Sequence, residues 1–168
     1  TSSANVALPA LAQAFHASFQ EAQWIVLAYL LAITTLIVSV GRLGDRVGRK
    51  RLLLAGLALF TMASVLCGAA STLGLLIAAR ALRGLGAAVM MALTMAFVGD
   101  AVPRSKAGTA MGLLGTMSAV GTALGPTVGG MLLAGPGWRT IFLLNVPLGL
   151  LAVLLAHRYL PVDRQEPK

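Results

Sequence analysis

Residues 41–56 read GRLGDRVGRKRLLLAG, a short charged stretch set between long hydrophobic ones. Of the 168 residues in the chain, 58% are hydrophobic and only 11% are charged. A soluble domain carries about 25% charged residues, so this composition is typical of a membrane protein. The formal net charge of +8 therefore has to be explained by where the cations lie along the chain.

Apolar stretches long enough to cross a bilayer, about 20 residues each, repeat along the chain. Pro103 and the turn at 135–137 separate neighbouring stretches, because proline cannot continue a helix. Residues 11–19 carry apolar side chains at helical spacing and predict a short element on the membrane surface. We expect an all-α, polytopic transmembrane helix bundle over residues 1–157 and the start of a linker at 158–168. Its helices are expected at about 1–10 (the end of a truncated first helix), 22–41, 52–70, 73–97, 108–134 and 139–157.

The position of the cations predicts how this bundle is oriented. If the helices cross alternately, the segment 42–51, the segment 98–107 and the end after 157 share one side of the membrane. Lys and Arg accumulate on the cytoplasmic side, so this side is expected in the cytoplasm of a cell-membrane protein. The charge then reflects topology, and no nucleic-acid partner is expected. The cytoplasmic side would hold Arg42, Arg46, Arg49, Lys50, Arg51, Arg104, Lys106, Arg158, Arg164 and Lys168, and the other side only Arg139.

Topology requires cations, but it does not require the glycines or Asp45 of the opening stretch. GRLGDRVGRKR closely resembles the signature loop between helices 2 and 3 of the major facilitator superfamily. LLIAARALRGLGAA at 75–88 resembles the fourth-helix motif of that superfamily, and GTALGPTVGG at 121–130 resembles the fifth-helix motif of its proton-driven exporters. NVALPAL near the start, QWIVLAYLLA at 23–32 and GWRTIFLLNVPLG at 137–149 are similar to the fourteen-helix drug–proton antiporter branch.

The resemblance covers essentially the whole chain and implies the N-terminal six-helix half of a major facilitator fold. It implies a transporter and no enzyme: a proton-coupled exporter of drugs or toxic compounds that works by alternating access. The proton gradient would drive transport without a cofactor or a metal. The partners would be the lipid bilayer, a small amphiphilic substrate and a C-terminal bundle of the same chain. Two alternatives stay open, a carrier for another solute such as a metabolite or sugar, and a non-transporting membrane protein.

The resemblance also assigns a conformational latch to the first motif. Glycines there let the end of helix 2 approach a neighbouring helix, and a carboxylate among cations can pair with arginines and with a helix N-terminus. The alternative is a cluster that only folds the loop. The latch residues expected are Gly41, Gly44, Asp45, Arg46, Gly48 and Arg49.

Arg80 and Arg83 lie inside the fourth apolar stretch, where a cation costs about 2.5–3.5 kcal/mol on insertion scales. They are three residues apart and project from a similar helix face. We expect them to serve proton coupling by facing a wet cavity and favouring proton release from a carboxylate. The alternative is that they pair with backbone groups and only fix the packing. No Asp or Glu lies within the apolar stretches, so the proton-carrying acid is expected elsewhere in the protein.

Several further residues are assigned by pattern. The antiporter motif comprises Gly121, Gly125, Pro126, Gly129 and Gly130, in which glycines four residues apart predict close helix contact and the proline predicts a kink. Asn5, Gln23 and Asn145 are candidates for lining a cavity, although interhelical hydrogen bonds explain them equally well. Cys67 is expected to be a small buried hydrophobe. Gly84 and Gly86 form a GxG without the strand–turn–helix context of a cofactor site.

Overall fold

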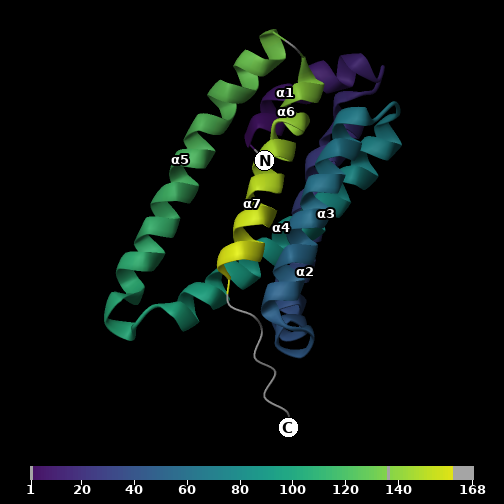
Figure 1. Ribbon diagram of the computed structural model, residues 1–168. Helices are drawn as coiled ribbons and strands as arrows, with labels where there is room; N and C mark the ends of the chain where they lie inside the picture. The colour runs from purple at the N-terminus through teal and green to yellow at the C-terminus, as the bar shows by residue number, and fades with distance from the viewer. Residues whose placement is uncertain (1, 136, 161–168) are drawn as a thin grey trace.

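The computed structural model describes residues 2–135 and 137–160, with the side chains at 2–6, 38, 41, 45, 100 and 101 left undescribed. All the elements in this part of the chain are helices, which confirms the expected all-α class (Figure 1). In chain order they are α1 (Ser2–Ala14), α2 (Phe19–Val47), α3 (Arg49–Ala69), α4 (Leu73–Ala101), the short 3-10 turn η1 (Arg104–Lys106), α5 (Ala107–Ala134), α6 (Trp138–Leu143) and α7 (Asn145–Tyr159).

Five segments of the described residues give the chain its membrane-spanning character. Each of them is long and apolar enough to cross a bilayer, and together they match the five complete stretches read from the sequence. The segments are Phe19–Ile37, Arg49–Ala69, Leu73–Gly99, Arg104–Ala134 and Trp138–Tyr159.

The N-terminal connection differs from the predicted surface element at 11–19. α1 continues to Ala14, and Leu11 is fully buried in the bundle. Leu11 follows the buried Ala7 by four residues, so both lie on one face of the same helix. The chain then turns at His16, which has a positive φ of 51°, and α2 begins after Ser18. Ser18 and Glu21 form the reciprocal capping box that their spacing predicts.

The charged segment 42–51, expected as a loop, is almost entirely helical. α2 runs to Val47 and α3 starts at Arg49, so only Gly48 separates them. Gly48 adopts a φ of +102°, which a residue without a side chain tolerates, and its N–H still bonds to the Gly44 carbonyl. Arginine and lysine are good helix formers, so both helices extend past the apolar spans that end and begin here.

The last predicted helix, 139–157, is divided in two. α6 ends at Leu143 and α7 starts at Asn145. Pro147 stands in the first turn of α7, and because it has no N–H it cannot bond to the carbonyl four residues before it. α7 extends to Tyr159, and residues 161–168 of the predicted linker lie outside the described part of the chain. α5, in contrast, continues through Pro126 as one helix, and the kink predicted there stays a prediction.

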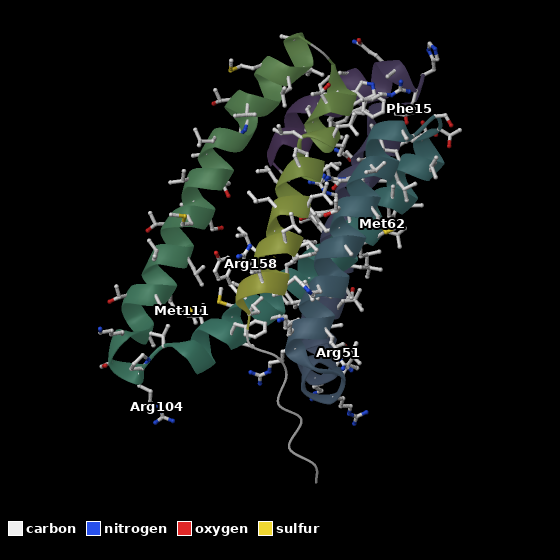
Figure 2. The ribbon with its side chains drawn as sticks, viewed as in Figure 1. Phe15, Arg51, Met62, Arg104, Met111 and Arg158 are labelled. Atoms are coloured by element: carbon white, nitrogen blue, oxygen red, sulfur yellow. The ribbon has the colours of Figure 1, made fainter. Side chains whose placement is uncertain are left out.

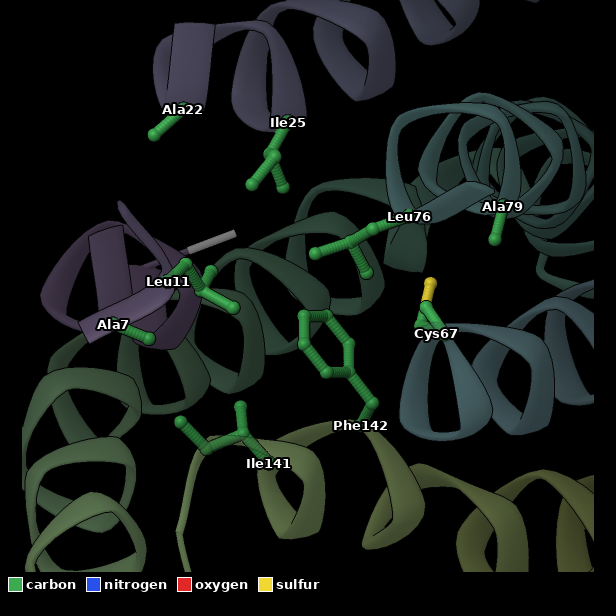
Figure 3. Packing of buried hydrophobic residues seen from close by; sticks show 10 residues of the cluster. Ala7, Leu11, Ala22, Ile25, Cys67, Leu76, Ala79, Ile141 and Phe142 are labelled. Atoms are coloured by element: carbon green, nitrogen blue, oxygen red, sulfur yellow. The ribbon is translucent and has the colours of Figure 1, made fainter. Parts of the chain in front are cut away.

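The core is organised around α4, which packs against both α2 and α3. One buried cluster joins α1, α2, α3, α4 and α6 around Phe142 (Figure 3). A second joins α2, α3, α4 and α7 around Leu57 and Leu93. Cys67 belongs to the first cluster and is buried, as predicted. α5 stands to one side of the bundle and packs against α1 and α6 (Figure 1).

Candidate functional site

Two arginines of α4 form the centre of the site, since both point into the bundle. Arg80 is 1% exposed and Arg83 is 8% exposed. The Nε of Arg80 donates a hydrogen bond to the Ile25 carbonyl of α2, at 3.1 Å. Each guanidinium also lies over an aromatic ring of a neighbouring helix. The Arg80 Cζ is 4.7 Å from the centroid of Tyr29, and the Arg83 Cζ is 4.6 Å from that of Phe60.

A third ring contacts both arginines. The Cζ atoms of Arg80 and Arg83 lie 5.8 Å and 5.7 Å from the ring centroid of Phe142, which α6 contributes. Cations and ring faces attract each other at such distances. We call this set the arginine–aromatic row, which consists of Tyr29, Arg80, Phe142, Arg83 and Phe60.

The charge of this row is not balanced within the described residues. Arg83 acts electrostatically on Arg80, and no carboxylate acts on either arginine in the described part of the chain. Arg80 Nη2 and Arg83 Nε are buried and have no hydrogen-bond partner in the described part of the chain. A buried donor without a partner is costly, and a carboxylate is the acceptor that suits a guanidinium best. Pairing with backbone carbonyls therefore accounts for only part of this site.

The first motif is only partly described. Gly44 is buried against α4, where an added Cβ would lie 2.8 Å from Cδ2 of Leu93. Arg46 is exposed and Arg49 is half-buried. The side chain of Asp45 and the surroundings of Gly41 lie outside the described part of the structure, so the latch stays a prediction.

The structure adds one contact of this segment that the sequence did not indicate. Lys50 donates a 2.6 Å hydrogen bond to the Leu160 carbonyl at the end of α7. A lysine suits this place because the last carbonyls of a helix carry partial negative charge.

The glycines of the antiporter motif are placed unevenly. Gly129 is buried and Gly125 is half-buried, whereas Pro126 is exposed. A Cβ at Gly121 or Gly130 would have no described neighbour within 4 Å outside its own helix. The close contact predicted for this stripe is therefore not made at Gly121 by the described residues.

The structure describes the side chains of two of the three cavity candidates. Gln23 is exposed, and the side chain of Asn5 lies outside the described residues. Asn145 is half-buried, and its Nδ2 donates to the Ile141 carbonyl at 3.0 Å, across the break between α6 and α7. The hydrogen bond is consistent with the hydrogen-bonding alternative, and the cavity role of Asn145 stays a prediction.

Sequence reasoning did not single out the aromatic residues of the row, Tyr29, Phe60 and Phe142, although a signal existed for the first two. Tyr29 is ten residues from the start of α2, Arg83 is ten from the start of α4, and Phe60 is nine from the end of α3. These helix ends lie on the same side of the membrane when crossings alternate. A rise of about 1.5 Å per residue therefore places the three side chains at similar depth.

Comparison with known proteins agrees with the motifs and the helical bundle. The family model of the Major Facilitator Superfamily matches residues 1–168. The chain belongs to the major facilitator superfamily. The resemblance drawn from the motifs is thus confirmed at the level of the family.

Named relatives cover most of the chain. The riboflavin transporter RibZ of Clostridioides difficile is 38% identical over 94% of this chain and 34% of its own length. The multidrug resistance protein Stp of Mycobacterium tuberculosis is 39% identical over 92% of this chain and 29% of its own. The methylenomycin A resistance protein of Streptomyces coelicolor is 36% identical over 93% of this chain and 33% of its own length. The chain therefore spans about a third of these relatives' length, and resistance proteins among them are consistent with the drug–proton antiporter branch.

Proposed function

We propose that this chain is part of a proton-coupled exporter of small amphiphilic compounds, which catalyses no chemical reaction on its cargo. The observation that carries the proposal is the buried pair Arg80 and Arg83 without a carboxylate among the described residues. Such a pair in a membrane helix is costly unless another group compensates it. The names of Stp and the methylenomycin resistance protein support export of toxic compounds.

The proton-carrying carboxylate would be supplied by the protein outside the described residues. When ionised, it would bind the free donors Arg80 Nη2 and Arg83 Nε. When it is protonated, this attraction is lost and the helices around the arginines can take a different arrangement. The arginines help the acid to release its proton, because a nearby cation favours the charged form of a carboxylate. Alternating access around a midplane site would couple this step to cargo movement, with a C-terminal bundle as the opposing wall and no cofactor.

A second candidate function is a carrier for another solute, such as a metabolite. One observation favours it, namely the 38% identity to a riboflavin transporter. The two candidates share the arginine pair and the proton coupling, and they differ in the cargo.

The orientation in the cell membrane is a further proposal. Arg51 and Arg104 lie at the end of the bundle opposite to Phe15, as the cation pattern requires (Figure 2). This end would be cytoplasmic, with the segment 42–51 and the C-terminal end of the chain. Ser71→Cys and Ser105→Cys, each in a Cys67→Ala background, provide a matched pair of exposed positions. An impermeant thiol reagent added to intact cells should label only position 71, and labelling at 105 would reverse the orientation.

The function itself is tested by transport in everted membrane vesicles that contain the full-length protein. Proton-driven accumulation of an amphiphilic dye, abolished by a protonophore, is the expected result. Accumulation of riboflavin but of no dye would favour the second candidate. Absence of proton-driven movement for either compound, in a protein that is folded and inserted, would contradict the proposal.

A further inference from the structure

We propose that Phe142 is a positioning residue for proton coupling, because its ring holds Arg80 and Arg83 in place and sets the electrostatic potential that they produce. This inference rests on the proposed function. It assigns a role to a residue that belongs to neither the latch nor the antiporter motif. The juxtaposition that carries it is one buried ring within 5.8 Å of two buried guanidinium carbons.

The first observation is the burial and the anchoring of the ring. Phe142 is 0% exposed and lies among Leu11, Leu76 and Cys67 in the first core cluster (Figure 3). On its outer side it contacts the edge of Trp138, with ring centroids 6.2 Å apart. Trp138 in turn packs on Phe15 of the α1–α2 connection, at 5.4 Å. A ring held from several sides keeps one position, and it therefore presents the arginines with a fixed partner.

The second observation is that two like charges share this ring. Arg80 and Arg83 repel each other in a medium where charges are poorly screened. The face of an aromatic ring carries partial negative charge. The ring of Phe142 thus offsets part of the positive potential of both arginines at once. Tyr29 and Phe60 each serve only one arginine.

The third observation is the segment that carries the ring. α6 is a six-residue helix, preceded by Gly137 with a φ of +100° and separated from α7 at Leu144. Leu144 keeps helical dihedral angles and its N–H bonds to the Thr140 carbonyl, so α6 forms the first part of the membrane-spanning segment Trp138–Tyr159. Phe142 therefore lies about one turn after the start of that segment, where its ring reaches the two arginines of α4.

The consequence concerns the pH at which the transporter works. The partial negative charge on the ring face lowers the positive potential of the arginine pair. A ring with less negative charge on its face therefore makes the site more positive. The coupling carboxylate then holds its proton less firmly. The pH of half-maximal proton-driven efflux should move toward acidic values.

The experiment replaces Phe142 in the full-length protein by mono-, di- and trifluorinated phenylalanine. Fluorine withdraws charge from the ring face and changes the shape of the side chain little. We expect half-maximal efflux to move to lower pH with each fluorine, by on the order of half a unit to one unit over the series. The same series at Phe97, which packs in the second core cluster, is the control and should leave the pH profile in place.

The outcomes separate this inference from the function on which it rests. A stepwise acidic shift at Phe142 and none at Phe97 supports it. If the parent exports the dye and every variant of the Phe142 series keeps the pH profile of the parent, the role of Phe142 is contradicted while the proposed function stands. A parent without proton-driven efflux contradicts the proposed function and this inference with it. Phe142→Leu is a second variant that removes the ring but keeps an apolar side chain, and its shift should equal or exceed that of the trifluorinated ring.

Discussion

α4 and α5 are apolar, glycine-containing helices of 29 and 28 residues, yet Gly86 of α4 and Gly121 of α5 meet opposite surroundings. A Cβ at Gly86 of α4 would stand 2.7 Å from the Gly56 carbonyl oxygen and 2.8 Å from the Phe60 nitrogen. A Cβ at Gly121 of α5 would have no described neighbour within 4 Å outside its own helix. Glycine allows the backbones of α3 and α4 to touch, whereas no such contact involves Gly121.

The comparison teaches that a glycine in an apolar helix does not by itself show a close helix contact, because the neighbouring helix decides whether one is made. α4 is fixed by contacts within this bundle at Gly84 and Gly86, so changes at these two glycines act on folding. At Gly121 the described residues impose no steric limit on a larger side chain. A role of the motif at this position would therefore require a partner beyond the described residues. Three substitutions test this difference, in order of their expected effect on stability.

Gly86→Ala should cause the largest loss of stability. The added methyl group meets backbone atoms of α3, which cannot rotate away as a side chain can. We expect a loss of about 1–3 kcal/mol in the free energy of unfolding, measured by denaturation of the purified protein in detergent. Gly74→Ala on the same helix is the control, since its Cβ would have no described neighbour within 4 Å outside α4. Equal stability of the two variants would refute the close crossing of α3 and α4.

Gly149→Ala tests whether close approach causes such a loss outside α4 as well. An added Cβ on α7 would overlap the Thr61 side chain of α3, which is itself bonded to the Leu57 carbonyl. We expect a loss of about 1–2 kcal/mol, smaller than at Gly86 because the obstacle is a side chain. Thr61→Ala in the same protein should restore at least half of that loss, as measured in a double-mutant cycle. Purely additive effects would show that the two residues do not touch.

Gly121→Ala should have the smallest effect on stability, within about 0.5 kcal/mol, and alanine favours the helix. The same variant should nevertheless reduce proton-driven efflux of the full-length protein if the antiporter motif acts through a partner beyond the described residues. Vesicle transport at matched protein level measures this. Normal stability together with normal efflux would remove Gly121 from the motif.

Much of this architecture could be predicted because it depends on local chemistry. The apolar spans follow from hydropathy, and the capping box at Ser18 follows from residue spacing. The helical course of residues 42–51 was missed because charge marks the edge of a membrane but does not break a helix. The division between α6 and α7 was missed although Pro147 stands inside the expected helix 139–157, where a proline removes a backbone hydrogen bond.

The site was predictable in part. Arg80 and Arg83 are conspicuous because cations are rare inside membrane helices. Their aromatic partners come from α2, α3 and α6, and only the tertiary packing brings these together. The contrast between the glycines of α4 and α5 likewise depends on which helix lies next to each.

The most direct test of the central claim, that Arg80 serves proton coupling, is dye efflux against pH for Arg80→Leu in the full-length protein. Leucine removes a buried charge that costs about 3 kcal/mol, so the variant should be at least as abundant as the parent. Arg139→Leu is the matched control, because Arg139 also stacks on a ring, at 5.2 Å, and bonds to one carbonyl, but it is exposed. We expect Arg80→Leu to lose proton-driven efflux and Arg139→Leu to keep it. Efflux by Arg80→Leu equal to that of the parent from about pH 6 to 9 would make Arg80 a packing residue and contradict the account.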